Sequence, residues 1–467
     1  MRRLLVLHSN DIHGRVEGLA RIATQVERER ERAGDAAVLY VDVGDVEDTT
    51  SRLSNLTKGI ALHRLLRVAG CGAVAVGNGT VIRYGVEPLA EQAAAGGYPL
   101  LAANLWRDGS VVPGVCASAV VDADGLRVGL IGLTPANWRE LYEQAFGVEL
   151  PPELPLVQAE LAALEKQNAD VVILLSHLGH DRDRELAQEL ADELPLIVGS
   201  HSHTLLRSGE RIGGVTIVQA GSHAEYLGRV ELELEGGIAR VADASVVAVT
   251  EETPLHPGVL AEIERIDAEL ASWLGEVVGD LADPLELADD RECSAAAFMA
   301  DVVRERMSAE VALVTAATAF DASLPAGPLT RGALYEACSS PGVSAAAEMT
   351  GAQLLDVVRR GLDPELAAEV PQSFRGRPRG LMHLSGAEVR GGKLLVGADE
   401  VDPECGYRVA GTDWELWDYG GYAPAEWGLD IEFDGTTIMR EAVEQHLLRH
   451  PGVTAPGARI NGRLDPA

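Results

Sequence analysis

Length and composition already limit what this protein can be. Hydrophobic residues make up 46% of its 467 residues, which is too high a share for a disordered chain. At about 150 residues per domain, the length predicts two or three domains. The formal charge of −33 argues against nucleic-acid polymers and membranes as main partners, because no basic surface exists to meet their phosphates. A small anionic substrate is still compatible with this charge, because bound metal ions reverse the local field.

The cysteines and the first residues indicate where the protein works. Five isolated cysteines, with no Cys-x-x-Cys pair, predict a reducing compartment and no disulfide framework. The chain turns polar at His8, too early for the apolar core of a signal peptide. No run of about 18 apolar residues occurs. We therefore expect a cytoplasmic protein, and these features leave its oligomeric state open.

The first 250 residues alternate short apolar runs with helical stretches. Runs rich in Val, Ile and Leu are typical of strands buried on both faces of a layered α/β domain. Strands are predicted at residues 4–7, 38–43, 73–76, 100–103, 128–133, 171–175, 196–198, 216–219 and 230–234. Amphipathic patterns predict helices over 17–32 and 156–167.

The pattern changes near Thr253 and Pro254. Apolar residues at helical spacing predict a helix over 258–274, and the acidic stretch 275–290 is typical of a loop. A second α/β segment begins near Cys293. We therefore expect a first domain over 1–250, a helical linker over 251–280 and a smaller α/β domain over 281–467.

Side chains that bind metals follow five of the predicted strands directly. They are Asp11, His13, Asp45, Asn78, His177, His201 and His203. The carboxyl ends of strands are where α/β sheets place their sites, and side chains two residues apart point the same way. One Asp-x-His or His-x-His alone is more often an ordinary loop. Five such ends in order favour a site for two divalent transition ions over a thiolate or calcium site.

The same motifs resemble a known family. The blocks at 8–14 (His-Ser-Asn-Asp-Ile-His-Gly), 44–45, 77–78, 176–179 and 199–203 are similar to those of the calcineurin-like metallophosphoesterases. Within them, the chain looks like a divergent, cytoplasmic-type member of the two-domain group of 5′-nucleotidases, UDP-sugar hydrolases and 2′,3′-cyclic phosphodiesterases. The C-terminal likeness is looser and includes Met349-Thr350-Gly351. The resemblance implies a four-layer α/β/β/α metallophosphatase domain, a helical connector and a smaller α/β domain.

The resemblance also implies a pair of divalent ions, of Mn, Zn, Fe or Co, that share one ligand. The ligands of the first ion would be Asp11, His13 and His203, those of the second Asn78, His177 and His201, and the shared ligand Asp45. A water or hydroxide between the ions would attack phosphorus in line, because the ions lower its pKa. The implied activity is hydrolysis of a phosphate ester of a small molecule, with a nucleotide or cyclic nucleotide as the expected substrate.

One block departs from the family pattern. The family's Gly-Asn-His-Glu/Asp reads Gly77-Asn78-Gly79-Thr80, so the His that assists the leaving group is replaced. Asn78 remains as metal ligand, and candidates for the lost role are Arg83, Asp48, His180 and His223. Each of these four also has an ordinary interpretation: Arg83 as a solvated charge at a helix start, Asp48 as a helix cap, and the two histidines as surface or satisfied residues. Because losing a general acid costs typically about 10²–10⁴-fold, the alternative is a metal-binding pseudoenzyme or ligand sensor.

The C-terminal segment departs further. The family binds phosphate there with arginines, but the equivalent residues 314–321 contain none. An aromatic cluster nearby could stack on a base, or could simply be core packing, and comprises Trp414, Trp417, Tyr419 and Tyr422. A second cluster, Arg375, Arg377 and Arg379, is interpreted as a solvated loop. A third function, a scaffold whose acidic surface recruits a basic partner, is the weakest hypothesis because the metal ligands are intact.

Overall fold

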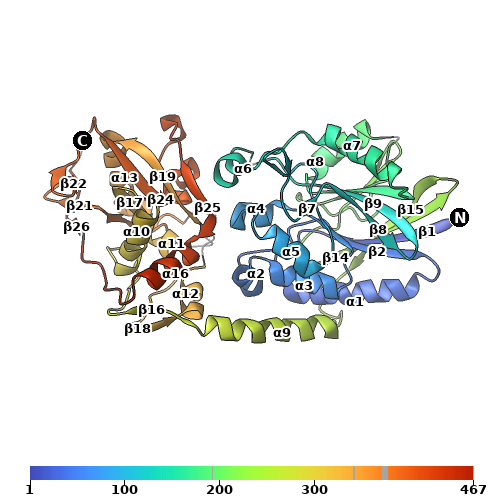
Figure 1. Ribbon diagram of the computed structural model, residues 1–467, viewed down its shortest axis with the longest axis horizontal. Coiled ribbons are helices and arrows are strands. Elements are labelled where there is room, and N and C mark those ends of the chain that lie inside the picture. Colours follow the sequence, from blue (N-terminus) through green and yellow to red (C-terminus); the bar gives the residue numbers. More distant parts are fainter. Residues whose placement is uncertain (138, 192, 340–341, 371–376, 466–467) are drawn as a thin grey trace. The chain divides into compact units, whose positions relative to one another are not determined.

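The computed structural model describes residues 1–137, 139–191, 193–339, 342–370 and 377–465. It consists of two compact units, Met1–Ala268 and Glu269–Ala467, and the boundary falls inside helix α9 (Pro257–Leu274) (Figure 1). Within the described ranges, no helix combines the length and apolar character needed to cross a membrane. All five cysteines are free thiols, as predicted.

The first unit contains two sheets. The seven-stranded sheet has the order β15 (Ile238–Ala248), β14 (Tyr226–Glu235), β1 (Arg2–Ser9), β2 (Ala37–Asp42), β3 (Ala73–Ala75), β4 (Leu100–Leu101) and β7 (Val115–Cys116). The six-stranded sheet has the order β12 (Glu210–Ile212), β13 (Val215–Val218), β11 (Leu196–Gly199), β10 (Val171–Ser176), β9 (Leu126–Leu133) and β8 (Ser118–Ala123). A short hairpin joins β5 (Trp106–Arg107) to β6 (Ser110–Val111).

The two sheets face each other across one hydrophobic core. Val6 and Val41 from the first sheet pack in the same buried cluster as Leu130, Ile173 and Val198 from the second. Helices cover the outer faces, which gives the α/β/β/α layers visible in Figure 1. The helices of this unit are α1 (Val16–Arg32), α2 (Arg52–Leu56), α3 (Ile60–Val68), α4 (Asn78–Tyr84), α5 (Leu89–Gly96), α6 (Arg139–Phe146), α7 (Glu153–Lys166) and α8 (His180–Glu189). Of these, α1 packs on the first sheet at β14, and α7 and α8 pack on the second sheet.

Most of the predicted elements are confirmed. All nine predicted strands of this unit are present, although the one at 100–103 ends at Leu101. The helices predicted over 17–32, 156–167 and 258–274 correspond to α1, α7 and α9. The prediction of a loop over 275–290 is wrong in part, because it contains β16 (Val277–Leu281), which pairs with β18 (Gly327–Thr330). The partner strand lies about 50 residues away, and it packs with α16 against β16, where Val278 and Leu281 are buried.

The second unit is also mixed α/β. Its five-stranded sheet has the order β20 (Met382–Ser385), β17 (Val311–Thr315), β24 (Gly406–Thr412), β19 (Val343–Thr350) and β25 (Glu432–Ile438). A smaller sheet has the order β23 (Asp399–Glu400), β22 (Lys393–Val396), β21 (Ala387–Arg390) and β26 (Ile460–Asn461). The helices are α10 (Ser294–Arg306), α11 (Ala316–Ala319), α12 (Arg331–Ala337), α13 (Gly351–Gly361), α14 (Pro364–Ala368), α15 (Asp413–Leu416) and α16 (Met439–Arg449).

Candidate metal centre

The loops that leave β1 and β2 are joined to each other by backbone hydrogen bonds. β1 and β2 are parallel neighbours, so their carboxyl ends lie at the same edge of the sheet. Beyond that edge, Asp11 N–H donates to Gly44 O at 3.0 Å, and His13 N–H donates to Asp45 O at 2.9 Å. These bonds hold Asp11 and His13 beside Asp45.

The other sheet supplies the remaining histidines. β10 and β11 are also parallel neighbours, and His177 follows β10 while His201 and His203 follow β11. His177 Nδ1–H donates to Val43 O at 2.5 Å, which connects the two sheets at this edge. The bond leaves His177 Nε2 to face the carboxylates that come from the first sheet.

The predicted ligands lie close together around Asp11. His13 Nε2 and His203 Nε2 are 3.1 Å apart, and they lie 3.9 and 3.6 Å from Asp11 Oδ1. His177 Nε2 lies 3.8 Å from the same oxygen and 3.5 Å from Asp45 Oδ2. In this geometry Asp11 is near both groups of ligands, whereas the resemblance implies Asp45 as the shared one.

Several of these side chains carry a buried polar atom that lacks a hydrogen-bond partner among the described residues. These atoms are Asp11 Oδ1, His13 Nδ1, Asn78 Oδ1 and His177 Nε2. By contrast, Asp11 Oδ2 accepts from Asn10 Nδ2 at 2.8 Å and Ser200 Oγ at 2.8 Å. A buried polar atom without a partner is costly, so groups of this kind are normally paired or bound to a metal. The oxygen and nitrogen donors fit divalent Mn, Zn, Fe or Co.

The backbone is strained at the same positions. Five of the seven predicted ligands have a left-handed backbone with a φ between 48° and 71°, and they are Asp11, His13, Asp45, His201 and His203. Each such conformation costs a non-glycine residue on the order of 1–3 kcal/mol and is typical of functional sites. The strain therefore marks this cluster independently of its chemistry.

Two buried carboxylates dominate the electrostatics. Burial lowers the pKa of His177, but the charges of Asp45 and Asp11 outweigh it and raise the pKa to about 9. Burial opposes ionisation of Asp45, yet His177 and the Gly79 N–H hold its pKa well below the usual value. The metal-free site thus retains a proton on His177 to offset its negative charge. A divalent cation would replace that proton.

Glycine residues make room for Asp45. A Cβ at Gly77 would overlap the carboxylate and approach Asp45 N to 2.6 Å. A Cβ at Gly79 would lie 2.9 Å from Asp45 Oδ1, the oxygen that accepts from Gly79 N–H at 2.6 Å. The position that holds His in the family is therefore tight against a predicted metal ligand.

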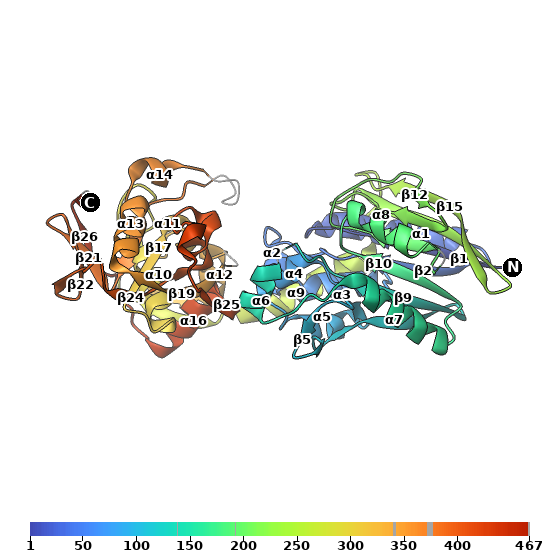
Figure 2. The same ribbon diagram turned by 90° about the horizontal axis from the view of Figure 1, so that it is seen from above.

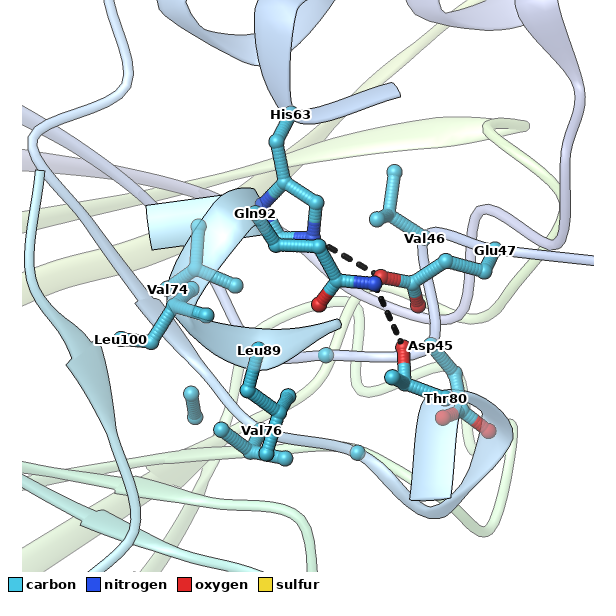
Figure 3. Close-up of a pocket in the computed structure, with 13 residues that line it drawn as sticks. Asp45, Val46, Glu47, His63, Val74, Val76, Thr80, Leu89, Gln92 and Leu100 are labelled. Atoms are coloured by element: carbon cyan, nitrogen blue, oxygen red, sulfur yellow. Dashed lines mark hydrogen bonds and ion pairs between the residues drawn. The ribbon is translucent and has the colours of Figure 1, made fainter. Parts of the chain in front are cut away.

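A small cavity of about 10 Å³ lies behind Asp45 and has room for about one water molecule. Figure 3 shows Glu47, His63, Thr80 and Gln92 around it, with Asp45 at its edge. His63 Nε2 contacts Glu47 Oε1 at 2.8 Å, and Gln92 Nε2 donates to Thr80 Oγ1 at 3.3 Å. These buried contacts hold α3, α4 and α5 against the loop that carries Asp45.

The structure separates the four candidates for the role of the missing His. Asp48 Oδ2 lies 4.0 Å from Arg83 Nη1 and 3.9 Å from His13 Nδ1, so Arg83 and Asp48 both lie beside the ligands. His223 also lies there, with its ring centroid 5.4 Å from that of His13. His180 instead pairs with Glu210 at 2.7 Å.

Asp48 and Arg83 differ in what they offer. Burial opposes ionisation of Asp48, but hydrogen bonds from Thr50 and the charges of Arg83 and His13 lower its pKa. Asp48 is therefore a carboxylate at neutral pH and holds no proton for a leaving group. Arg83 Nη1 is buried and has no hydrogen-bond partner in the described part of the chain. Its N–H groups suit a phosphoryl oxygen.

One further residue joins the site without any motif to mark it. Asn137 Nδ2 lies 3.1 Å from His201 Nε2 and so orients that imidazole. Asn137 follows β9, whose carboxyl end lies beside that of β10. The other ligands were predicted because they directly follow a strand. Asn137 was missed because three residues separate it from the end of β9.

In the second unit, the structure corrects the interpretation of the arginine cluster as a solvated loop. The Arg377 guanidinium pairs with Asp321 and donates to Phe320 O at 2.9 Å. The side chain of Arg379 is 11% exposed and donates to Gly420 O. Both thus contact segments where the resemblance places substrate-binding residues, including the segment 314–321 that lacks arginine. Arg375 lies outside the described residues.

The predicted aromatic cluster is only partly accessible. Tyr422 is 1% exposed and belongs to the hydrophobic core of its unit, with Arg379 against its ring at 5.6 Å. Core packing therefore explains Tyr422. Trp414 lies 6.0 Å from the Arg379 guanidinium, and the Trp417 ring contacts Phe433 with centroids 5.3 Å apart. Both tryptophans are half-buried, and the side chain of Tyr419 lies outside the described part.

Comparison with known proteins agrees with this architecture. Residues 277–425 match the family model of the 5′-nucleotidase C-terminal domain. An uncharacterized metallophosphoesterase, YunD of Bacillus subtilis, is 25% identical over 407 residues, which are 85% of this chain and 87% of the relative. A 5′-nucleotidase of Diplobatis ommata is 27% identical over 64% of this chain, which spans only 59% of that relative. The crystal structure of a 5′-nucleotidase precursor from Thermus thermophilus covers 99% of the chain and 100% of its own length at 21% identity, with a TM-score of 0.55.

The sheet sandwich with its cluster of Asp, Asn and His side chains defines a two-domain metallophosphoesterase architecture. The C-terminal match and the relatives that span most of the chain show that the protein has the two-domain architecture of the 5′-nucleotidases. Its N-terminal domain is of the calcineurin-like metallophosphoesterase type and its C-terminal domain is of the 5′-nucleotidase type.

Proposed function

We propose that this protein is a metal-dependent phosphoesterase that hydrolyses a phosphate ester of a small molecule, with nucleotides as the leading substrate class. The observation that carries the proposal is the set of buried ligand atoms on Asp11, His177 and Asn78 that have no hydrogen-bond partner among the residues the structure describes. The substrate class rests on the relatives and the C-terminal match, which are described as 5′-nucleotidases.

The metal ligands would be the seven side chains already described, namely Asp11, His13, Asp45, Asn78, His177, His201 and His203. Two divalent ions there would lower the pKa of a water molecule and neutralise charge on the phosphoryl oxygens. The chain itself supplies preorganisation. Ser200 holds Asp11 and the Val43 carbonyl holds His177, so the remaining atom of each already points into the site.

Arg83 is the proposed phosphate-binding residue. Its buried Nη1 is available for a phosphoryl oxygen, and the carboxylate of Asp48 lies 4.0 Å away, where it orients the guanidinium. Asp48 is accordingly proposed as a positioning residue rather than a proton donor. In the second unit, a flat anionic group is proposed to contact Arg379, Trp414 and Trp417.

The proposal is tested by metal content and turnover together. We expect two metal ions per chain by elemental analysis, and hydrolysis of at least one nucleotide, phosphomonoester or phosphodiester with Mn²⁺ or Co²⁺. Asp45→Asn should abolish turnover. Asp108→Asn is a matched control, because Asp108 also has a left-handed backbone but lies exposed in another loop. A protein that binds no metal would contradict the proposal.

A metal-binding pseudoenzyme or ligand sensor is the second candidate. It is favoured by Gly79, which replaces the family's His, and by the lowered pKa of Asp48, which leaves that carboxylate beside His13 without a proton to donate. Full metal occupancy with no turnover on any substrate in the screen would support the sensor over the enzyme.

A further inference from the structure

A second group of metal-binding side chains lies in the C-terminal unit, far along the chain from the residues discussed so far. Glu305 is in the last turn of α10, His446 is in the last turn of α16, and His450 caps that helix. Two histidines four residues apart lie on the same face of a helix. α10 and α16 pack side by side, as Figure 2 shows, so both histidines face Glu305.

The three side chains are arranged around one point. His446 Nδ1 lies 2.8 Å from Glu305 Oε2, and His450 Nε2 lies 3.1 Å from Glu305 Oε1. The two imidazole centroids are 4.5 Å apart. Ligand atoms of a tetrahedral Zn²⁺ site, each about 2.0–2.1 Å from the ion, are about 3.3 Å apart, so only small shifts are needed.

An ion pair alone explains this geometry poorly. His446 Nδ1 is buried and faces Glu305 Oε2 at 2.8 Å, but it makes no hydrogen bond in the described part of the chain. A buried nitrogen of this kind is costly unless something binds it. Arg449 also approaches Glu305, at 3.4 Å, but its side chain is 55% exposed and its Nε donates to Gln445 O at 3.1 Å.

We propose that Glu305, His446 and His450 form a zinc site that ties α10 to α16. Two imidazoles and one carboxylate suit Zn²⁺, with a water as fourth ligand on the side where His450 is exposed, and do not suit Mg²⁺ or Ca²⁺. Most of α10 is buried in this unit. An ion that binds the folded unit and joins α10 to α16 therefore stabilises the fold of the unit. The site is independent of the metal centre in the first unit.

The test uses the full chain, stripped of metal and then dialysed against Zn²⁺. Wild type should retain one more equivalent of zinc by elemental analysis than His450→Ala or Glu305→Gln. His256→Ala is the matched control and should retain the wild-type amount, because His256 lies 3.8 Å from Glu27, accepts from Val259 N–H at 3.3 Å and belongs to no group of metal-binding side chains in the described part of the chain. Zn²⁺ should also raise the Tm of wild type more than that of His450→Ala.

Circular dichroism checks that each variant is folded, and His450 is exposed enough to be replaced without disturbing the core. Equal zinc content in wild type, His450→Ala and Glu305→Gln would overturn the proposal. So would binding of Mg²⁺ at the same residues with equal affinity, because a site for Zn²⁺ discriminates by its nitrogen ligands.

Discussion

The two units hold their candidate functional residues in different ways. In the first unit, the ligands directly follow parallel strands, and backbone bonds such as the one from Asp11 N–H to Gly44 O place them. In the second unit, Arg377 reaches Asp321 across 56 residues by a side-chain contact. A site built on backbone is rigid and intolerant of change, whereas a site built on long side chains adjusts.

This difference predicts how substitutions act. Changes next to the ligands in the first unit should remove metal and turnover together. Changes in the arginine and aromatic cluster of the second unit should leave metal binding intact and alter only how substrate is held.

The largest effect is expected for Gly77→Ala. The new methyl group would overlap the Asp45 carboxylate. We expect the metal affinity to fall by more than about 10²-fold, because replacing a residue that only supports a ligand typically costs about 10–100-fold. Isothermal titration calorimetry with Mn²⁺ measures this. Gly457→Ala, with nothing within 4 Å, is the control and should bind like wild type. Unchanged affinity in Gly77→Ala would show that the loop is not rigid.

Ser200→Ala should have a smaller effect. Its hydroxyl donates to Asp11 Oδ2 at 2.8 Å, and losing such a bond to a ligand costs roughly 10–100-fold in metal affinity. Ser245→Ala removes a serine that donates to Asp243 away from the site, and should have no effect. If both variants bind Mn²⁺ equally well, Asp11 does not depend on this hydrogen bond.

Metal affinity should also depend on pH. The pKa of His177, raised to about 9 by Asp45 and Asp11, means that a proton occupies the imidazole below that pH. A metal must displace this proton, so affinity should rise about tenfold per pH unit as the pH approaches 9 and then level off. Chelator competition at several pH values tests the slope. A flat profile between about pH 7 and 9 would contradict the raised pKa.

Arg379→Ala should have the smallest effect. Loss of its contacts with Gly420 O and Trp414 should raise KM for a nucleotide by roughly threefold to tenfold, with metal content unchanged. Arg390→Ala, which removes an exposed arginine paired with Glu388, is the control. Loss of metal in Arg379→Ala would contradict the proposal that changes in the second unit leave metal binding in the first unit intact.

The sequence was sufficient to predict nine strands of the first unit and most of the side chains that the structure brings together at the candidate centre. Apolar runs mark buried strands locally, and a polar residue directly after such a run lies at the sheet edge without further information. It could not reveal Asn137, which is separated from the end of its strand by three residues. The sequence also showed no arginine within residues 314–321. It could not show that Arg377, from a distant segment, contacts Asp321 there.

What the sequence by itself determined, then, is the layered α/β fold of the first unit and the chemistry at its strand ends, because both depend on residues adjacent in the chain. Tertiary structure alone decided the pairing of β16 with β18, the burial of Tyr422 and the position of Arg379. It also brought Glu305 to His446 and His450. Each of these contacts joins segments tens to more than a hundred residues apart, and no local pattern encodes which distant segments meet.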